Sequence, residues 1–465
     1  MKKILIAGTT VIGAAVLVAP YFIGEHAEKQ FIQGHEWLQQ EIIYPQVSVQ
    51  QGEYRKSWFS SETSTRVTIT PAAEGEEPVS FELLHHINQL PLPTGMMRVQ
   101  SELVLPAEVS EKLEEYFNGA PLLTAQTVVG YGGSTTTTLT SPGYSGPLKS
   151  DEALQLDWQG LEGSISSDSQ MRHVSASLSA PGLSFEDGEG KVTLSQLHYN
   201  TEIVRGMHDL WFGTSGASME QIEIDVETPE SGPTRMQMNN ARLTTEQRED
   251  DTRVDIDGKL TFDTIEVNGF SVSDGVYDVA YHNLDAASLG QLNSSVKQLM
   301  QEQPQDPSLL FAGMMPHLQG LFSQKPELAI RQLQVETPMG TVSGKLHMAL
   351  TDVLNDAVMQ DPTMLMDIVK IDLDASLPKP MLMGLLSTSA SNTVMQIAKA
   401  QGQELSAEEL AEQSSALMQQ QLQGLLAQQL MVEQGDNYAT SIQYNQQKLM
   451  INDQDATPMI SALLQ

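Results

Sequence analysis

Two adjacent histidines, His85 and His86, are the residues of this chain best suited to metal binding or general-base catalysis. Imidazole serves both purposes near neutral pH. The pair lies in a stretch expected to form a β-strand, where neighbouring side chains point to opposite faces, so both rings cannot reach one metal ion without distortion. No glutamate or cysteine stands at ligand spacing from them, and the other histidines are scattered singly. The sequence therefore predicts no metal site.

Paired carboxylates are the second candidate for chemistry, for example Asp255 with Asp257 and Asp372 with Asp374. At this spacing on a strand both members share one face, about 7 Å apart. Glycosidase chemistry would need a cleft and an elevated pKa, and the alternating neighbours indicate a solvated sheet surface instead. The segment from Asp187 to Gly190 resembles part of a calcium loop but lacks the remaining ligands, so we expect a turn there.

The segment Gly130-Tyr131-Gly132-Gly133 could form a phosphate-binding nest. No helix signal follows it, however, and Thr135 to Thr138 favour a strand, so a glycine turn into a strand is expected. The chain has no Gly-x-Ser-x-Gly elbow, Walker loop or dinucleotide fingerprint. We therefore assign no catalytic, cofactor-binding or metal-ligating residue and expect a protein that is not an enzyme, with a hydrolase as the least favoured hypothesis.

Most of the chain after residue 47 must supply strands, because apolar residues alternate with polar ones. This period predicts strands with one buried and one wet face, which is typical of an antiparallel sheet. Clusters of Gly, Pro, Asn, Asp and Ser punctuate the runs. The alternating sets are Val67 and Ile69; Val174, Ala176 and Leu178; Ile222, Ile224 and Val226; Val254, Ile256, Leu260 and Phe262; Val342, Leu346, Met348 and Leu350; and Val369, Ile371, Leu373, Ala375 and Leu377.

Two helix-rich stretches, 285–323 and 380–433, are available to cover the apolar face of such a sheet. In the second, Ser406 and Glu409 have the spacing of a capping box, and Gly435 is a suitable stop. Strand pattern returns at 439–452. If the sheet is closed, Leu417 to Leu430 should cover Val254, Ile256 and Phe262; if it is a groove, these three should face an open cavity.

The N-terminus carries an uncharged apolar run, residues 4–24, preceded by Lys2 and Lys3. As a helix it reaches about 30 Å, enough to span a bilayer. Positive charge before it predicts export of the remaining chain. A cleaved signal is the alternative, but such a core is shorter, and Pro20 after Ala19 disfavours cleavage. Without cysteine, lipoprotein processing is excluded.

The composition excludes some classes of binding partner but does not identify one. The formal net charge is −34, which disfavours nucleic-acid binding and gives no cationic patch for anionic lipids. The excess of acidic residues is explained by solubility. The alternative explanation is an acidic face that binds a basic partner or divalent cations. With no cysteine there are no disulfides. The chain has 23 methionines, which either fill gaps between helices and sheet or line a groove for an acyl chain or an apolar segment.

Several landmarks occur in an order that resembles a known family. They are the anchor and short helix, Tyr54-Arg55-Lys56-Ser57-Trp58-Phe59-Ser60-Ser61, the Gly130 to Gly133 turn, Leu156 to Gly163, and Tyr444 to Asn452. Together they resemble the YdgA-like family of bacterial inner-membrane proteins, a domain family of unknown function. Ser57 replaces the family's glycine, and its His-Gly-Pro segment is represented only by His85-His86-Ile87 with Pro91 and Pro93 downstream. The resemblance implies inner-membrane localisation and self-association, without a reaction.

The sequence thus predicts an α+β, mainly antiparallel protein: one transmembrane helix, then a large curved or extended sheet covered by two helical segments. The expected parts are the anchor 1–24, a membrane-proximal helix 25–46, a β-rich region 47–284 and a mixed region 285–465. We expect a single-pass inner-membrane protein with its bulk in the periplasm, acting as a non-enzymatic envelope maintenance or scaffolding protein, as a homodimer or with an envelope partner. The alternative is binding or transfer of lipid or another hydrophobic ligand in an apolar groove.

Overall fold

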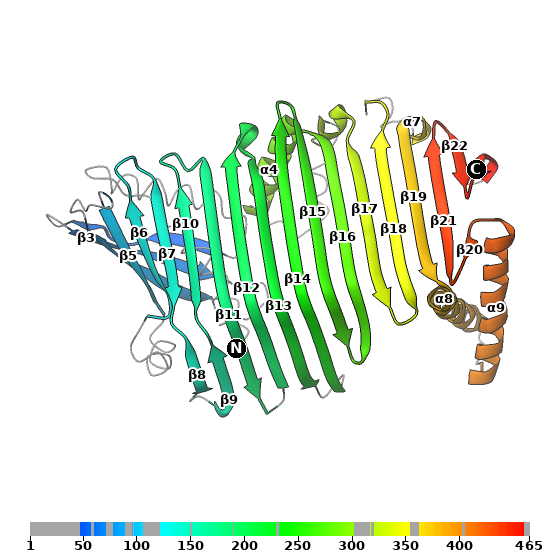
Figure 1. Cartoon of the computed structure of the whole chain (residues 1–465), viewed down its shortest axis with the longest axis horizontal. Helices are drawn as coiled ribbons and strands as arrows, with labels where there is room; N and C mark the ends of the chain where they lie inside the picture. Colours follow the sequence, from blue (N-terminus) through cyan, green and yellow to red (C-terminus); the bar gives the residue numbers. More distant parts are fainter. Residues whose placement is uncertain are drawn as a thin grey trace. The chain divides into compact units, whose positions relative to one another are not determined.

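A computed structural model describes residues 47–56, 60–70, 78–88, 95, 97–105, 121–148, 151–188, 190–228, 232–301, 317, 320–353, 362–401 and 405–459. The predicted anchor and the helix after it lie outside these residues. Within the described part of the chain, no helix is both long and apolar enough to cross a membrane. The chain divides into two compact units, Met1–Thr252 with Ala286–Gly320 and Arg253–Asp285 with Leu321–Gln465. Figure 1 shows that strands dominate the described residues.

The first unit is an antiparallel sheet in which most strands pair with their neighbours in sequence. The order is β1-β3-β4-β5-β6-β7-β10-β11-β12-β13-β14, with β2 beside β3 and the β8–β9 hairpin beside β11. The strands are β1 (Val47–Gln51), β2 (Arg55–Lys56), β3 (Ser60–Ile69), β4 (Val79–Asn88), β5 (Met97–Val104), β6 (Thr124–Val129), β7 (Thr135–Ser141), β8 (Tyr144–Leu148), β9 (Asp151–Trp158), β10 (Leu161–Ser167), β11 (His173–Asp187), β12 (Gly190–Arg205), β13 (Trp211–Thr228) and β14 (Gly232–Asp250).

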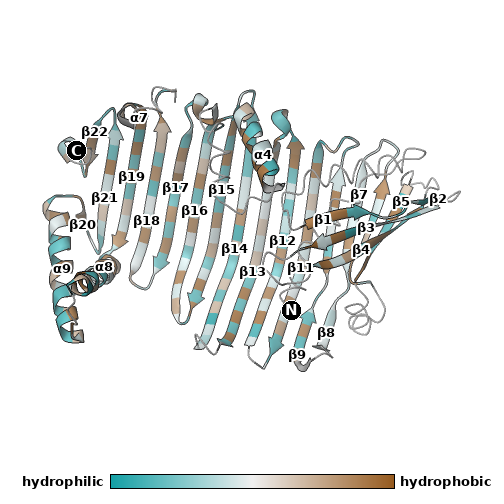
Figure 2. Ribbon diagram, turned by 180° about the vertical axis from the view of Figure 1, so that it is seen from behind, coloured by the Kyte–Doolittle hydropathy of each residue, from teal (hydrophilic) through white to brown (hydrophobic). Residues whose placement is uncertain are grey.

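The N-terminal strands of the first unit curl around a core of their own. Alternate residues of β3, β4, β5 and β7 point inward, and Val67 and Leu139 are fully buried. The same cluster takes in Val49 from β1 and Ala180 from β11, so the two ends of this run of strands face each other (Figure 2). The predicted period-two pattern therefore produces a closed, well-packed core here.

Helix α4 (Ala286–Gln301) belongs to the first unit and confirms the start of the predicted stretch 285–323. It packs against η2 (Met207–Asp209), the short connection between β12 and β13. Gly290 makes this approach feasible, since a Cβ there would lie 2.6 Å from the carbonyl oxygen of His208. Most of the remainder of that stretch, with Met314 and Met315, lies outside the described residues.

The second unit is a single antiparallel sheet in the order β15-β16-β17-β18-β19-β21-β22, with β20 beside β21 and β23 beside β22. The mainly antiparallel fold class is confirmed in both units. The elements are β15 (Arg253–Val267), β16 (Phe270–Asp285), η3 (Phe322–Gln324), β17 (Glu327–Thr337), β18 (Gly340–Leu350), α7 (Pro362–Ile368), β19 (Val369–Pro378), α8 (Lys379–Ala400), α9 (Ala407–Ala427), β20 (Val432–Gln434), β21 (Asn437–Asn445), β22 (Lys448–Ile451) and β23 (Gln454–Asp455).

The predicted capping box of the second helical stretch is confirmed. Ser406 Oγ accepts from the Glu409 backbone N–H at 3.2 Å, and the Glu409 carboxylate accepts from the Ser406 backbone N–H at 2.9 Å. Gly435 is not the helix stop that we expected, because α9 already ends at Ala427. It lies instead, with φ +60°, in the two-residue turn between β20 and β21. The predicted strand at 439–452 is a hairpin formed by β21 and β22.

The expectation that these helices cover the sheet is wrong for the described residues of the second unit. Helix α9 packs on α8, and α8 contacts the sheet at β19 and β21 and, through Lys379 and Glu433, at β20 (Figure 1). Because α8 begins at Lys379, directly after β19 ends at Pro378, no loop allows it to fold back over the strands. Leu417 to Leu430 therefore do not cover β15, and Ile256 and Phe262 are only half-buried, although Val254 is buried.

Candidate functional site

The two histidines singled out from the sequence point to opposite faces, as predicted. His85 is buried in the first unit, with Nε2 2.9 Å from Thr65 Oγ1 and Nδ1 2.7 Å from Ser101 Oγ. His86 is exposed and lies 3.3 Å from Glu62 Oε1. A buried ring between two hydroxyls satisfies its hydrogen bonds inside a core. In the described residues no group of three or more His, Asp or Glu could hold a metal ion.

Two of the other sequence candidates are turns, as expected. Asp187 pairs with Gly190 at the end of the β11–β12 hairpin, and Asp187 Oδ1 accepts from the Gly190 N–H at 2.8 Å. The glycine segment lies between β6 and β7, where the Gly130 N–H donates to Ser134 O at 2.8 Å. Gly133 has φ +82°, which favours glycine. Both segments are therefore explained by chain reversal.

The predicted carboxylate pairs lie on a charged face of the second unit. Arg331 joins three strands here, with Nη1 2.7 Å from Asp257 Oδ1 and Nε 2.7 Å from Asp278 Oδ1. The register of β17 shifts between Ile330 and Leu333, so Arg331 stands in a β-bulge. A bulge redirects a side chain relative to regular alternation. Hydrogen bonding to Asp278 raises the pKa of Arg331, and we call this surface the ionic face.

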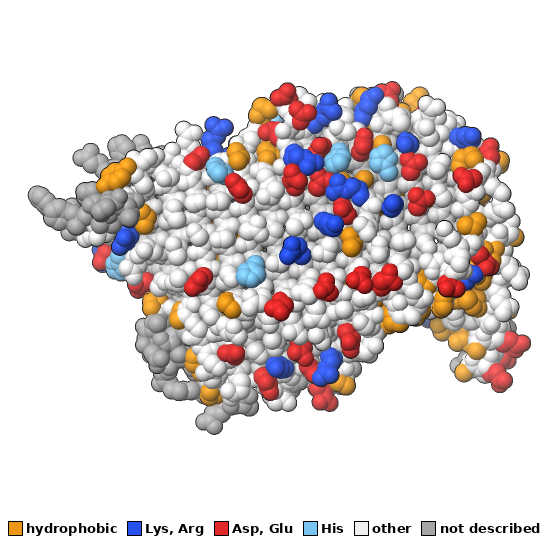
Figure 3. Space-filling view, viewed as in Figure 1, with side chains coloured by type: hydrophobic (Ala, Val, Ile, Leu, Met, Phe, Trp, Pro, Cys, Tyr) orange, Lys and Arg blue, Asp and Glu red, His pale blue; other side chains and the backbone are white. Residues whose placement is uncertain are grey.

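The ionic face continues toward β19 with weaker contacts. His347 Nε2 lies 3.4 Å from Glu327 Oε2, and its Nδ1 lies 3.7 Å from Asp372 Oδ2. Lys370 also contacts Asp372, at 2.9 Å. Figure 3 shows charged and histidine side chains over these strands, with few hydrophobic ones. Asp257, Asp278 and Asp372 each lie within ion-pair distance of a basic side chain. Since most of these ion pairs join different strands, they form a network across the ionic face that stabilises the sheet.

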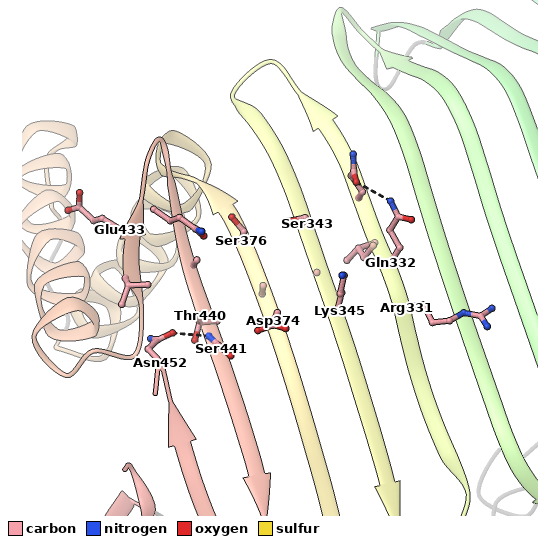
Figure 4. A pocket seen from close by; sticks show the side chains of 17 residues that line it. Arg331, Gln332, Ser343, Lys345, Asp374, Ser376, Glu433, Thr440, Ser441 and Asn452 are labelled. Carbon is pink, nitrogen blue, oxygen red and sulfur yellow. Dashed lines mark hydrogen bonds between the residues drawn. The ribbon is translucent and has the colours of Figure 1, made fainter. Parts of the chain in front are cut away.

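A hollow of about 850 Å³ is lined by residues of β17 to β21 and by Asn452 (Figure 4). Lys345 and Asp374 face each other across β18 and β19 on its floor, with Ser343 and Ser376 beside them. Its rim includes Asn452, whose Oδ1 accepts from the Ser441 N–H at 2.8 Å. The residues that line the hollow include serines, Lys345 and Asp374 but no histidine.

The opposite face of the second unit is apolar. Residues that pair across the strands share a face, which gives three rows that we call the apolar rows. None of their members is charged. The rows are Leu260, Tyr277, Leu333, Gly344, Ala375 and Thr440; Gly258, Val279, Ile330, Leu346, Leu373 and Ile442; and Ile256, Tyr281, Leu328, Met348, Ile371 and Tyr444.

The apolar rows are open over most of their length. Leu260, Tyr281 and Leu333 are between 40% and 44% exposed, whereas inward residues of the first unit such as Val67 are fully buried. Figure 2 shows no helix of the second unit over β16, β17 or β18. In the part of the chain that the structure describes, α7 contacts the rows at their β21 end, where Tyr444 donates to Met366 O at 2.8 Å. Within the described residues, this is an extensive apolar surface that lacks a second layer.

Comparison with known proteins adds a family. A family model described as "Bacterial protein of unknown function (DUF945)" matches residues 1–459. The chain belongs to this family. No curated protein and no solved structure matches the chain significantly. Membership in the DUF945 family agrees with the expectation of a domain family of unknown function and assigns no reaction.

The sequence predicted which residues of this DUF945 chain form the apolar face, but not that this face is exposed to solvent. The alternation of Leu346 and Leu373 with charged neighbours already indicated one apolar and one charged face. The network around Arg331 was missed, because its bulge breaks the alternation. The signal that could have indicated the bulge is the tetrapeptide Ile330-Arg331-Gln332-Leu333, in which two polar residues, instead of one, separate two apolar residues.

Proposed function

We propose that this chain is a membrane-anchored protein of the bacterial envelope whose second unit binds the acyl chains of lipid along the apolar rows. The observation that carries the proposal is the uncharged, uncovered face formed by β15 to β19. Its five strands span four spacings of about 4.8 Å, or about 19 Å in total. One leaflet of a bilayer has a hydrocarbon depth of about 15 Å. An acyl chain that lies across the strands therefore fits within the rows.

The favoured occupant is lipid because of where the chain is expected to reside. Residues 4–24 have the length and composition of a bilayer span, and Lys2 and Lys3 favour export of the rest to the periplasm. Lipid is then the apolar partner at the highest local concentration. Leaving Leu260, Tyr277 and Leu333 in water is unfavourable, at roughly 25 cal/mol per Å² of apolar surface, and covering them with acyl chains removes that cost.

The scaffold hypothesis is less well supported than lipid binding. It required Leu417 to Leu430 to cover the apolar residues of β15, and α9 packs on α8 instead. A second copy of the chain, stacked face to face on the apolar rows, is the remaining competitor for this surface. A non-enzymatic role is retained in the proposal, with lipid as ligand and not as substrate.

The test is photo-crosslinking in cells with benzoyl-phenylalanine placed in the full-length chain. Leu346 and Leu373 lie on the apolar rows, and their neighbours Lys345 and Asp374 lie on the ionic face of the same two strands. These neighbours are matched controls, since only the face differs. We expect lipid adducts, detected by mass spectrometry of the purified chain, at Leu346 and Leu373 and at neither control.

Two outcomes would overturn the proposal. Equal lipid labelling at all four positions would indicate non-specific exposure to lipid. A crosslinked dimer formed from Leu346, without lipid adducts, would assign the apolar rows to a second copy of the chain.

A further inference from the structure

Helix α8 exposes large apolar side chains although α9 packs along it. Its buried side chains are Leu382, Ala390, Val394 and Ala398. Four others remain in solvent: Met383 at 41%, Leu385 at 55%, Met395 at 46% and Ile397 at 51% exposed. Single exposed apolar residues are ordinary, but four on one helix indicate a surface that another apolar medium covers.

The charge pattern of α8 is unusual for this chain. Residues 380–398 contain no charged side chain, in a protein with a formal net charge of −34. The two lysines stand at its ends, where Lys379 Nζ is held 2.6 Å from Glu433 Oε2 and Lys399 is exposed. The Thr388 and Thr393 hydroxyls donate to carbonyls one turn earlier, at 3.0 and 2.9 Å. Hydroxyls satisfied within the helix cost less in an apolar medium.

The positions of the exposed side chains distinguish a fluid partner from a protein partner. At about 100° per residue, Met383 and Leu385 lie about 160° apart around the helix. Met395 and Ile397 have the same separation near the other end. A partner helix or groove covers one stripe of a helix. Lipid, in contrast, can surround apolar side chains on several sides of a helix that lies in the interface.

We propose that α8 docks on a lipid surface and lies in its interfacial layer, flanked by its two lysines. Because Lys379 is already paired and Glu408, Glu409 and Glu412 are exposed on α9, the preferred surface is zwitterionic rather than anionic. The inference rests on the proposed function, since β19 leads directly into α8 and so connects this surface with the apolar rows. Acyl chains would enter the rows at this end of the sheet.

The absence of cysteine from the chain makes a fluorescence test direct, since each introduced cysteine is the only one. The full-length chain, reconstituted in vesicles of phosphatidylethanolamine and phosphatidylcholine, carries an NBD label on Leu385→Cys, Ile397→Cys or, as a control on the ionic face, Lys345→Cys. We expect a blue-shifted emission and a several-fold loss of intensity with doxyl-labelled lipids for the first two labels only. Adding phosphatidylglycerol should not increase this quenching.

The opposite results are equally clear. Labels on α8 that resemble the Lys345→Cys control would overturn the inference, as would quenching that requires phosphatidylglycerol. Blue-shifted labels that lipid quenchers do not reach, but that a label on another copy quenches, would assign α8 to a protein interface. The crosslinks at Leu346 and Leu373 are measured independently, so lipid on the apolar rows without quenching on α8 would refute only the docking helix.

Discussion

Replacing Arg331 with methionine should loosen the middle of the second unit. The guanidinium contacts Asp257 and Asp278 at 2.7 Å each and thereby connects β15, β16 and β17. The two carboxylates are only 13% and 18% exposed, whereas Arg331 is 45% exposed. Methionine keeps the length of the apolar stem but leaves both carboxylates without this partner. The sheet has no second layer in its described part to compensate.

The size of the effect follows from the burial of the partners. A hydrogen bond to a charged group contributes about 1.5–3 kcal/mol when buried, and an exposed ion pair contributes about 0.2–1 kcal/mol. Since Arg331 is nearly half exposed, we discount each contact to about 1–1.5 kcal/mol, or about 2–3 kcal/mol for both. That corresponds to a loss of protection of about 30- to 150-fold in local opening.

Hydrogen exchange measured by mass spectrometry on peptides from β15 to β17 reads out this opening. The matched control is Arg235→Met in the first unit, where Arg235 and Asp225 are 65% and 40% exposed and the expected change is below about 1 kcal/mol. Arg331→Lys, which keeps the charge but loses the fork, should fall between them. If Arg331→Met changes protection no more than Arg235→Met, the reasoning about the ionic face is refuted.

Two further predictions concern single positions. Hydrogen bonds from the backbone and hydroxyl of Ser406 lower the pKa of Glu409. The stabilisation that these bonds give α9 is therefore present above the pKa of Glu409 in the unfolded chain, about 4.3. It is lost as the pH falls through the lower pKa of Glu409 in the folded chain. Protection of the first turn of α9 should therefore decrease in acid, whereas Glu409→Gln should show little such dependence, and equal pH profiles would contradict this. Gly213→Ala should destabilise the first unit by about 2–4 kcal/mol in a denaturation midpoint, since φ is +135° and the new Cβ would lie 2.1 Å from the carbonyl oxygen of Glu202. Gly258→Ala, where the nearest atom is 3.4 Å away, is the control, and equal shifts would refute the argument.

The local structure could largely be predicted from the sequence, because it depends on neighbours along the chain. All six alternating sets fall within strands, from Val67 in β3 to Leu377 in β19. The capping box at Ser406 was confirmed for the same reason, since its two partners are three residues apart. The candidate site was predicted only in part. The sequence placed Asp257 on a wet face, but it could not place Arg331 beside it, because that contact depends on a bulge in a strand that follows more than sixty residues later.

The amino-acid sequence by itself determined which residues share a face, where the strands alternate, and that one face of the second unit is apolar and the other charged. A period of two fixes the side of each residue without reference to the rest of the fold. Only the tertiary structure decided what packs against each face. In the first unit the strands curl and bury Val67 and Leu139 against one another. In the second unit α8 and α9 leave the sheet at the end of β19, so the apolar rows stay open. The alternation of apolar and polar residues along a strand sets the face to which each side chain points. Whether another layer packs on that face depends on the path of segments that are distant in the chain.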